Sequence, residues 1–230
     1  MKTLGLIGGT TWISTVDYYK YINQLTAEKL GGANSAKILL YSLNFEELKT
    51  LFYASDWPRV AEILTEIAKN LENAGAKAIV LCSNTTHIPA GEIQRRINIP
   101  LIHIADSTAR EINRLNLKKV ALLGTRFTMD SDYYREKLRA FGIELIIPNA
   151  AEREFINSSI FNELGKNIFS AETKQKYLEI IENLSARGAE GVIFGCTEIP
   201  MLLSAEDCPV PSFDTTLIHA RAAVEFALAD

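Results

Sequence analysis

Residues 73–89 read NAGAKAIVLCSNTTHIP, and residues 186–200 read ARGAEGVIFGCTEIP. Each stretch runs from a Gly-Ala turn through an apolar run to a nucleophilic residue beside Asn or Thr. The two copies are offset by 113 residues (196 − 83), so Ser83 in the first corresponds to Cys196 in the second. Two such ends facing each other could touch opposite faces of one small molecule. Chemistry that moves a proton from one face of a carbon to the other needs that arrangement.

Short apolar runs alternate with longer helical patterns along the whole chain, which is typical of β-α-β units around a parallel sheet. The runs are rich in Val, Ile and Leu without polar alternation, as expected for strands covered on both faces. We therefore expect an α/β protein. Its predicted strands are Thr3–Ile7, Lys37–Ser42, Ala78–Leu81, Leu101–His103, Val120–Leu123, Glu144–Ile147, Gly191–Phe194 and Val210–Phe213. Its clearest predicted helices are Val16–Leu30, Pro58–Ala74, Thr173–Arg187 and Thr216–Ala229.

The duplication divides the chain into two similar halves. Leu6–Thr10 resembles Leu122–Thr125, because each is an apolar strand that ends in a Gly/Thr turn. We expect two pseudo-symmetric lobes, each a mostly parallel sheet flanked by helices, with the active site in the cleft between them. The first lobe is predicted to comprise residues 1–105 plus 215–230, with the terminal helix packed back onto it, and the second lobe residues 106–214. Open α/β sheets bind ligands at the carboxyl ends of their strands.

The composition is that of an ordinary globular protein, with 47% hydrophobic and 23% charged residues. A net charge of −4 argues against a nucleic-acid partner, since phosphate binding usually needs a basic face. We find no signal-peptide pattern and no apolar run long enough for a bilayer, so no membrane partner is expected. Three cysteines without CxxC spacing indicate a reduced, cytoplasmic compartment. The histidines lack metal-ligand spacing, and no metal site is predicted.

Cys196 is the strongest candidate for a catalytic residue. It directly follows the apolar strand GVIFG and precedes Thr197 and Glu198. Beside the amides that start a helix, the pKa of a thiol can fall toward neutrality, and the thiol then accepts and donates protons. Cys82 lies one position off the repeat, and strand alternation turns it away from the face of Ser83. We therefore expect Cys82 to be structural.

Ser83, Asn84 and Thr85 occupy the equivalent strand end in the first half. Backbone amides and short hydroxyl or amide side chains of this kind suit a carboxylate. The stretch Gly8–Thr11 lacks the spacing of a dinucleotide or phosphate loop and indicates instead a close backbone approach to a small ligand. His87 is a candidate to orient the Ser83 loop, and the alternative is a purely core role.

These motifs together resemble the aspartate/glutamate racemase family of cofactor-independent amino-acid racemases. The resemblance extends over nearly the whole chain, through LGLIGGTTWISTVDYY, LCSNTTH, HIADST, ALLGTRFTM, VIFGCTEIP and FDTTLIHA. VIFGCTEI is the most specific of these motifs. The chain is especially similar to the bacterial broad aspartate/glutamate racemase branch, whose first motif has a hydroxyl residue before Asn-Thr. The resemblance implies two pseudo-symmetric α/β lobes and no cofactor.

In this family, two cysteines stand on opposite sides of the substrate α-carbon. One removes the α-proton, and the other reprotonates the opposite face. The resemblance places Cys196 as the second cysteine and Ser83 at the position of the first. The substrate-binding set that we expect is Thr10, Thr11, Phe52, Asn84, Thr85, Thr125, Lys166, Thr197 and Glu198.

Two features depart from the family pattern. Ser83 is a far weaker acid than a thiol, so we expect L-to-D turnover to predominate. The returning proton would then come from Ser83 or from a water molecule that it holds. The region for the substrate side chain has no Arg or Gln at Phe52, and Lys166 lies one place from the expected family lysine.

We therefore predict an isomerase, an L-to-D-biased racemase of aspartate, glutamate or a related amino acid. Its predicted partners are the small amino-acid substrate and a second copy of the chain in a homodimer. Two alternatives remain. One is a one-thiol decarboxylase or isomerase of the same superfamily, which needs only Cys196 to protonate a carbanion. The other is a ligand-binding protein that lost turnover with the first cysteine.

Overall fold

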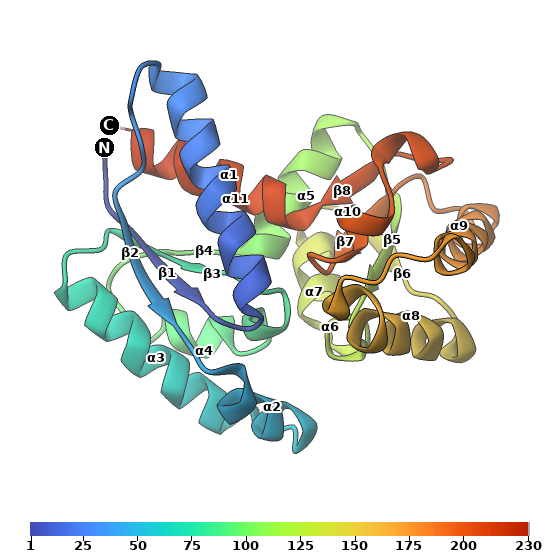
Figure 1. Ribbon diagram of the computed structural model, residues 1–230, viewed down its shortest axis with the longest axis horizontal. Helices are drawn as coiled ribbons and strands as arrows, with labels where there is room; N and C mark the ends of the chain where they lie inside the picture. The colour runs from blue at the N-terminus through green and yellow to red at the C-terminus, as the bar shows by residue number, and fades with distance from the viewer. Residues whose placement is uncertain (230) are drawn as a thin grey trace. The chain divides into compact units, whose positions relative to one another are not determined.

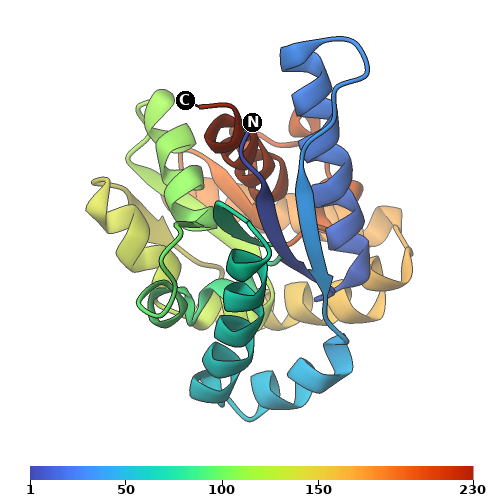
Figure 2. The same cartoon turned by 90° about the vertical axis from the view of Figure 1, so that its left-hand side faces the viewer.

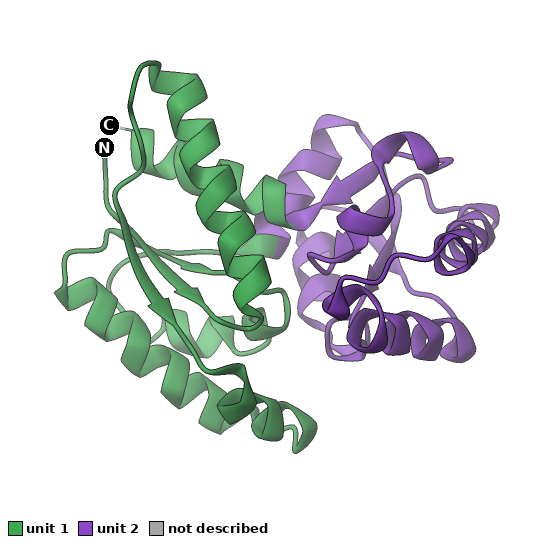
Figure 3. Cartoon of the chain, in the orientation of Figure 1, with its two compact units in different colours: residues 1–104, 216–230 green, residues 105–215 purple. Residues whose placement is uncertain are grey.

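The computed structural model describes residues 1–229 and divides into two compact units (Figure 3). Unit 1 comprises Met1–Ile104 and Thr216–Asp230, and unit 2 comprises Ala105–Thr215. The chain therefore leaves unit 1 after Ile104 and returns to it at Thr216. Within residues 1–229, no helix combines the length and apolar character that a membrane crossing requires.

Unit 1 contains a four-stranded parallel sheet with the strand order β2-β1-β3-β4 (Figure 1). Its strands are β1 (Leu4–Gly8), β2 (Ile38–Ser42), β3 (Ala78–Leu81) and β4 (Leu101–Ile102). Its helices are α1 (Trp12–Leu30), α2 (Phe45–Tyr53), α3 (Trp57–Asn73), the 3-10 turn η1 (Thr85–His87), α4 (Ala90–Gln94) and α11 (Thr215–Leu228).

Unit 2 repeats this topology with the strand order β6-β5-β7-β8, again entirely parallel. Its strands are β5 (Lys119–Gly124), β6 (Glu144–Ile146), β7 (Val192–Gly195) and β8 (Ser212–Asp214). Its helices are α5 (Ile104–Arg114), α6 (Arg126–Asp130), α7 (Tyr133–Ala140), α8 (Ala150–Asn162), η2 (Leu164–Lys166), α9 (Ala171–Ala186), α10 (Ile199–Leu202) and η3 (Ala205–Asp207). The predicted α/β class, with two parallel sheets flanked by helices, is confirmed.

Strand register shows that the sequence repeat is also a structural repeat. In unit 1, Leu81 of β3 pairs with Ile7 of β1, and in unit 2 Phe194 of β7 pairs with Leu123 of β5. Leu81 and Phe194 have the same offset of 113 (194 − 81) that relates the two sequence motifs. The residues that follow these strands therefore occupy equivalent sheet edges in the two units.

Helices cover both faces of the unit 1 sheet (Figure 2). The face toward α1 and α11 has a hydrophobic core, whose buried members are Leu4, Leu6, Tyr18, Ile22, Ala78, Val80, Cys82, Ala220, Ala223, Val224 and Ala227. On the face toward α3, a Cβ on Gly5 would lie 3.2 Å from Leu71 Cβ of that helix, so the sheet and the helix are in close contact. On the other face, the small side chains of Ala220, Ala223 and Ala227 bring α11, which is the last helix of the chain, onto the first strands.

Element boundaries differ from the prediction where turn chemistry decides them. The first helix begins at Trp12 rather than Val16, because the extended Thr11 is its N-cap. The last strand begins at Ser212 rather than Val210, because Pro211 has no N–H to donate to a sheet ladder. The prediction also omitted α2, in which the Asn44 side chain accepts a hydrogen bond from Glu46 N–H.

A buried histidine fastens α11 to the rest of unit 1. His219 Nε2 donates to the carbonyl oxygen of Ile102 at 2.7 Å, so Nδ1 is the acceptor for the Tyr18 hydroxyl at 2.8 Å. The pKa of His219 is lowered to about 4, mainly by burial and to a smaller extent by the nearby His103. The neutral imidazole is therefore the form that stabilises the fold.

Acidification is expected to remove the contribution of His219 to the stability of unit 1. Because its folded pKa is depressed, the contribution is fully present above the unfolded pKa of about 6.5 and is lost as pH falls toward about 4. Complete protonation corresponds to about 3 kcal/mol. Urea unfolding of the wild type and of His219→Gln across this pH range measures the effect. The difference in unfolding free energy between the two proteins should shrink as pH falls, because only the wild type loses the contribution of His219. The carboxylates titrate in both proteins, so their effect cancels in this difference. A difference that stays constant would contradict the assignment.

Candidate active site

Polar residues gather at the carboxyl ends of the neighbouring strands β1 and β3 in unit 1, and we call this group the first polar edge. Cys82 N–H donates to the Ile7 carbonyl at 2.9 Å, and the chain then turns through Ser83. Ser14, near the start of α1, donates its hydroxyl to the carbonyls of both Thr11 (2.8 Å) and Cys82 (3.2 Å). One side chain thereby links the loop after β1 to the loop after β3.

The loop after β1 follows a path that only glycine permits at one position. Gly9 has φ +94°, and a Cβ there would lie 2.1 Å from the Leu43 carbonyl oxygen. Thr15 Oγ1 accepts from Gly9 N–H at 2.7 Å and donates to the Thr11 carbonyl at 3.2 Å. The Thr11 hydroxyl oxygen is itself buried and has no hydrogen-bond partner among the described residues. A buried polar atom in this condition is suited to a ligand.

The residues that follow β3 present short polar side chains. Ser83 is partly exposed, whereas Asn84 and Thr85 are buried, with 6% and 8% exposure. The Ser83 carbonyl accepts two hydrogen bonds at 2.8 Å, from Thr86 Oγ1 and from His87 Nδ1. Unit 1 thus brings together Thr10, Thr11, Ser83, Asn84 and Thr85 of the predicted set at one sheet edge.

The second polar edge lies in unit 2, where β5 and β7 end. Gly124 pairs with Gly195, so Thr125 and Cys196 come next on neighbouring strands. Cys196 is partly exposed, and its Sγ donates to Glu198 Oε2 at 2.8 Å. Thr197 Oγ1 donates to the same carboxylate oxygen at 2.8 Å, and Glu198 is 5% exposed.

The charge environment of Cys196 corrects one prediction. The sequence suggested a thiol whose pKa is lowered by helix-start amides. Burial instead raises the pKa of Cys196 well above its ordinary value, and the negative charge of Glu198 raises it further. The backbone amides of residues 197 and 198 act in the expected direction but are outweighed. Cys196 is therefore a thiol in the unliganded protein, and Glu198 contacts it directly.

Cys82 has the surroundings of a core residue. It is fully buried within the hydrophobic cluster under α1 and α11, and its Sγ lies 3.9 Å from the Val80 carbonyl oxygen. Burial raises the pKa of this thiol far above its ordinary value. These surroundings match the structural role that strand alternation predicted for it.

Three other predicted residues are held by contacts within their own units. Thr125 caps α6, and its Oγ1 accepts from Thr128 N–H at 3.4 Å. Lys166 is exposed at the end of η2, an element that packs against α10. Phe52 is 3% exposed, and its ring packs 5.5 Å from Trp57 and 6.1 Å from Phe45. The Phe52 ring therefore joins α2 to α3.

Tyr177 is a neighbour of the second edge that the sequence did not reveal. Its hydroxyl bonds with Ser159 Oγ at 2.9 Å. Burial raises the pKa of this phenol, the Ser159 bond opposes that shift, and the nearby acidic groups Cys196, Glu163 and Glu198 raise it further wherever they are ionised. The helical pattern marked Tyr177 only as one of several core positions on α9, so nothing in its spacing indicated that it lies near Cys196.

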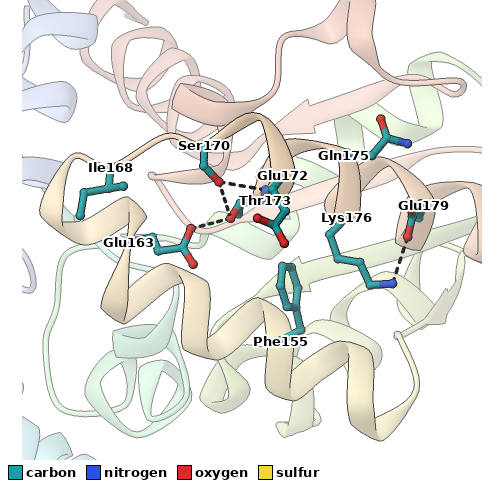
Figure 4. A pocket seen from close by; sticks show the side chains of 9 residues that line it. All are labelled: Phe155, Glu163, Ile168, Ser170, Glu172, Thr173, Gln175, Lys176 and Glu179. Carbon is teal, nitrogen blue, oxygen red and sulfur yellow. Dashed lines mark hydrogen bonds and ion pairs between the residues drawn. The ribbon is translucent and has the colours of Figure 1, made fainter.

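A separate cavity lies in unit 2, beside the start of α9 (Figure 4). Glu163, which follows α8, accepts a hydrogen bond from Thr173 of α9 across it. None of the predicted site residues is among its lining residues, which are Phe155, Glu163, Ile168, Ser170, Glu172, Thr173, Gln175, Lys176 and Glu179.

Residues 1–229 contain no group of three or more His, Cys, Asp or Glu side chains placed to hold a metal ion.

The chain is similar in sequence to a family of known proteins. Residues 7–223 match the family described as Asp/Glu/hydantoin racemase. The broad-specificity amino-acid racemase RacX of Bacillus subtilis is 25% identical over 232 residues, which cover 98% of each chain.

Two solved structures are similar over their whole length. A candidate Asp/Glu racemase from Yersinia pestis has 47% identity and a TM-score of 0.95, with full coverage of both chains. PH1733, an aspartate racemase homologue from Pyrococcus horikoshii, has 37% identity and a TM-score of 0.88, again with full coverage.

Replacing Glu198 by Gln is expected to speed the alkylation of Cys196 by iodoacetamide at neutral pH. The substitution removes the negative charge that helps to raise the thiol pKa, and the thiolate fraction grows about tenfold for each pKa unit lost. The rate of mass gain on the Cys196 peptide measures the change, and the peptide with the buried Cys82 is the internal control. Equal or slower alkylation in the variant would contradict this account of the carboxylate.

Proposed function

Because the chain belongs to the Asp/Glu/hydantoin racemase family, we propose that it is an amino-acid racemase in which Cys196 removes the α-proton of an L-amino acid. The 2.8 Å hydrogen bond from Cys196 Sγ to Glu198 Oε2 carries this proposal. A thiol in contact with a carboxylate has a direct route for losing its proton. The thiol and the carboxylate together supply the acid–base chemistry, so the reaction needs no pyridoxal phosphate.

Substrate binding is what makes Cys196 reactive. In the unliganded protein, burial and the charge of Glu198 hold the thiol pKa high. The α-ammonium group of an amino acid brings a positive charge to the site, and a positive charge favours the thiolate. Glu198 Oε2, which accepts the hydrogen bond from Cys196 Sγ at 2.8 Å, is the group placed to take up the thiol proton. The positive charge of the substrate therefore increases the fraction of Cys196 that is thiolate.

Proton abstraction breaks the Cα–H bond and forms a new S–H bond on Cys196. The electron pair left on the α-carbon delocalises into the substrate carboxylate, which then carries more negative charge. Hydrogen-bond donors placed where charge develops are a large source of catalysis. The buried side chains of Asn84 and Thr85 and the unpartnered Thr11 hydroxyl are donors of this kind.

The second step is return of a proton to the α-carbon, and we assign this step to Ser83. Strand register makes its position in unit 1 equivalent to that of Cys196 in unit 2, and we propose that Ser83 delivers the returning proton. The Ser83 hydroxyl, or a water molecule bound to it, gives its proton to the α-carbon and forms the D-amino acid, and the alkoxide or hydroxide left behind regains a proton from solvent. A serine hydroxyl is too weak an acid to provide an anionic base near neutral pH, so we expect kcat from the L-amino acid to exceed kcat from the D-amino acid, with a matching difference in KM because the equilibrium constant of racemisation is unity.

Aspartate, glutamate or a related amino acid is the proposed substrate. PH1733 is named an aspartate racemase homologue, and RacX is named a broad-specificity racemase, so the relatives support this range. A side-chain carboxylate needs a cation or several donors. Lys166 is exposed beside α10, which directly follows the Cys196 segment. We assign Lys166 to that carboxylate.

Cys196→Ser is expected to abolish deuterium incorporation at the α-carbon of L-aspartate and L-glutamate in D₂O. The substitution removes the only cysteine that is positioned at the second polar edge. Cys82→Ala is the matched control, because it removes a buried thiol of the same chain, and it should keep most of the wild-type rate. NMR of the α-proton and chiral chromatography follow the two products. An active Cys196→Ser enzyme with an inactive, folded Cys82→Ala enzyme would refute the assignment.

The same assay separates the proposed racemase from the alternatives. A racemase gives deuterated D-product, whereas a one-thiol enzyme that only protonates a carbanion gives deuterium in recovered L-substrate alone. A ligand-binding protein gives neither product but still binds the amino acid in calorimetry.

Ser83→Cys is expected to raise turnover of the D-enantiomer and bring the two directions closer together. A thiol has a reference pKa of about 8.5, so some thiolate exists near neutrality and can remove the α-proton of a D-amino acid. Ser83→Ala is the control that removes the hydroxyl without adding a base. Initial rates from each enantiomer measure the effect. A folded Ser83→Cys enzyme with no gain from the D-enantiomer would show that this side chain does not face the α-carbon.

A further inference from the structure

All three histidines of the chain gather in unit 1. The ring centroid of His87 lies 4.9 Å from that of His103 and 5.4 Å from that of His219. His87 is 1% exposed, so its ring is shielded from bulk solvent. A buried ring of this type must satisfy both nitrogens within the protein.

The hydrogen bonds of His87 define its tautomer. The Ser83 carbonyl can only accept, so His87 Nδ1 carries the proton and donates to it at 2.8 Å. The Ile104 N–H can only donate, so His87 Nε2 accepts from it at 3.2 Å. Burial lowers the pKa of His87 well below its ordinary value, and the neighbouring histidines lower it further. The neutral ring is thus held by one bond at each nitrogen.

The two bonded partners of His87 have different places in the chain. Ser83 belongs to the proposed reprotonation site. Ile104 is the last residue before the chain leaves unit 1, and α5 begins there. The ring therefore connects the Ser83 turn to the crossover segment. Thr86 also bonds to the Ser83 carbonyl, but that contact stays within the turn and makes no link to Ile104.

We propose that His87 is a positioning residue that holds Ser83 against the crossover segment and thereby sets how much of the turnover ends as D-amino acid. This inference rests on the proposed function. After Cys196 has taken the α-proton, the carbanion is reprotonated either by Cys196, which returns L-amino acid, or from the Ser83 side, which gives D-amino acid. A shift of Ser83 by about 1 Å slows only the second path, because reacting groups must meet in a narrow geometry.

The test measures the ratio of D-product to deuterated L-amino acid in D₂O. His87→Phe keeps a ring of similar size and removes both hydrogen bonds. It is expected to lower the ratio about tenfold or more, with deuterium incorporation into L-amino acid largely retained. His87→Asn keeps an amide donor near the position of Nδ1 and should restore most of the ratio. Tyr18→Phe is the matched control, because it removes a buried hydrogen bond of the same cluster that does not involve Ser83 or Ile104.

The outcomes are distinct. A ratio that falls in His87→Phe and recovers in His87→Asn supports the proposal. A ratio equal to that of the wild type, with both products falling together, would show that His87 is merely structural. If His87→Phe does not fold by circular dichroism, the ratio of His87→Asn against Tyr18→Phe decides, and a lower ratio in Tyr18→Phe overturns the proposal. A wild-type enzyme without deuterium incorporation would refute the proposed function itself, and this inference with it.

Discussion

Parallel strand pairing is the constraint on which both polar edges depend. Backbone hydrogen bonds fix Leu81 opposite Ile7 and Phe194 opposite Leu123, so each nucleophilic position follows a strand that cannot slip. A slip of one residue would turn every side chain of the strand to the other face. Ser83 would then move into the core, and the apolar Cys82 position would move to the edge. The register of two short buried strands thus decides which residues are available for chemistry.

The two edges differ in their electrostatics although they share one topology. The unit 2 edge holds an anion, Glu198, in direct contact with a thiol whose pKa is raised by burial. The unit 1 edge holds neutral hydroxyl and amide groups, and the Ser83 carbonyl there accepts a hydrogen bond from the neutral ring of His87. In a duplicated fold the backbone repeats, but the charge at each edge depends on a few side chains. The two strand ends therefore offer different chemistry, with a thiol beside a carboxylate in unit 2 and short hydroxyl and amide side chains in unit 1.

Unit 1 relies on buried polar pairs at the points where the chain leaves and returns. His219 joins α11 to β4 through the Ile102 carbonyl, and His87 joins the Ser83 turn to Ile104. Each imidazole has one donor and one acceptor that are both satisfied, so burial costs little as long as the ring stays neutral. Protonation of His87 would turn its accepting Nε2 into a second donor that faces the Ile104 N–H.

The sequence by itself determined the α/β class, the internal repeat and the offset that relates Ser83 to Cys196, because hydrophobic periodicity and turn residues are local signals. It also indicated that Cys82 is a core residue, since strand alternation is local too. Only the tertiary structure decided that the pKa of Cys196 is raised, because burial and the orientation of Glu198 depend on packing. The same reason applies to Phe52, whose ring packs with Trp57, and to His87, whose partners Ser83 and Ile104 become neighbours only when the chain folds.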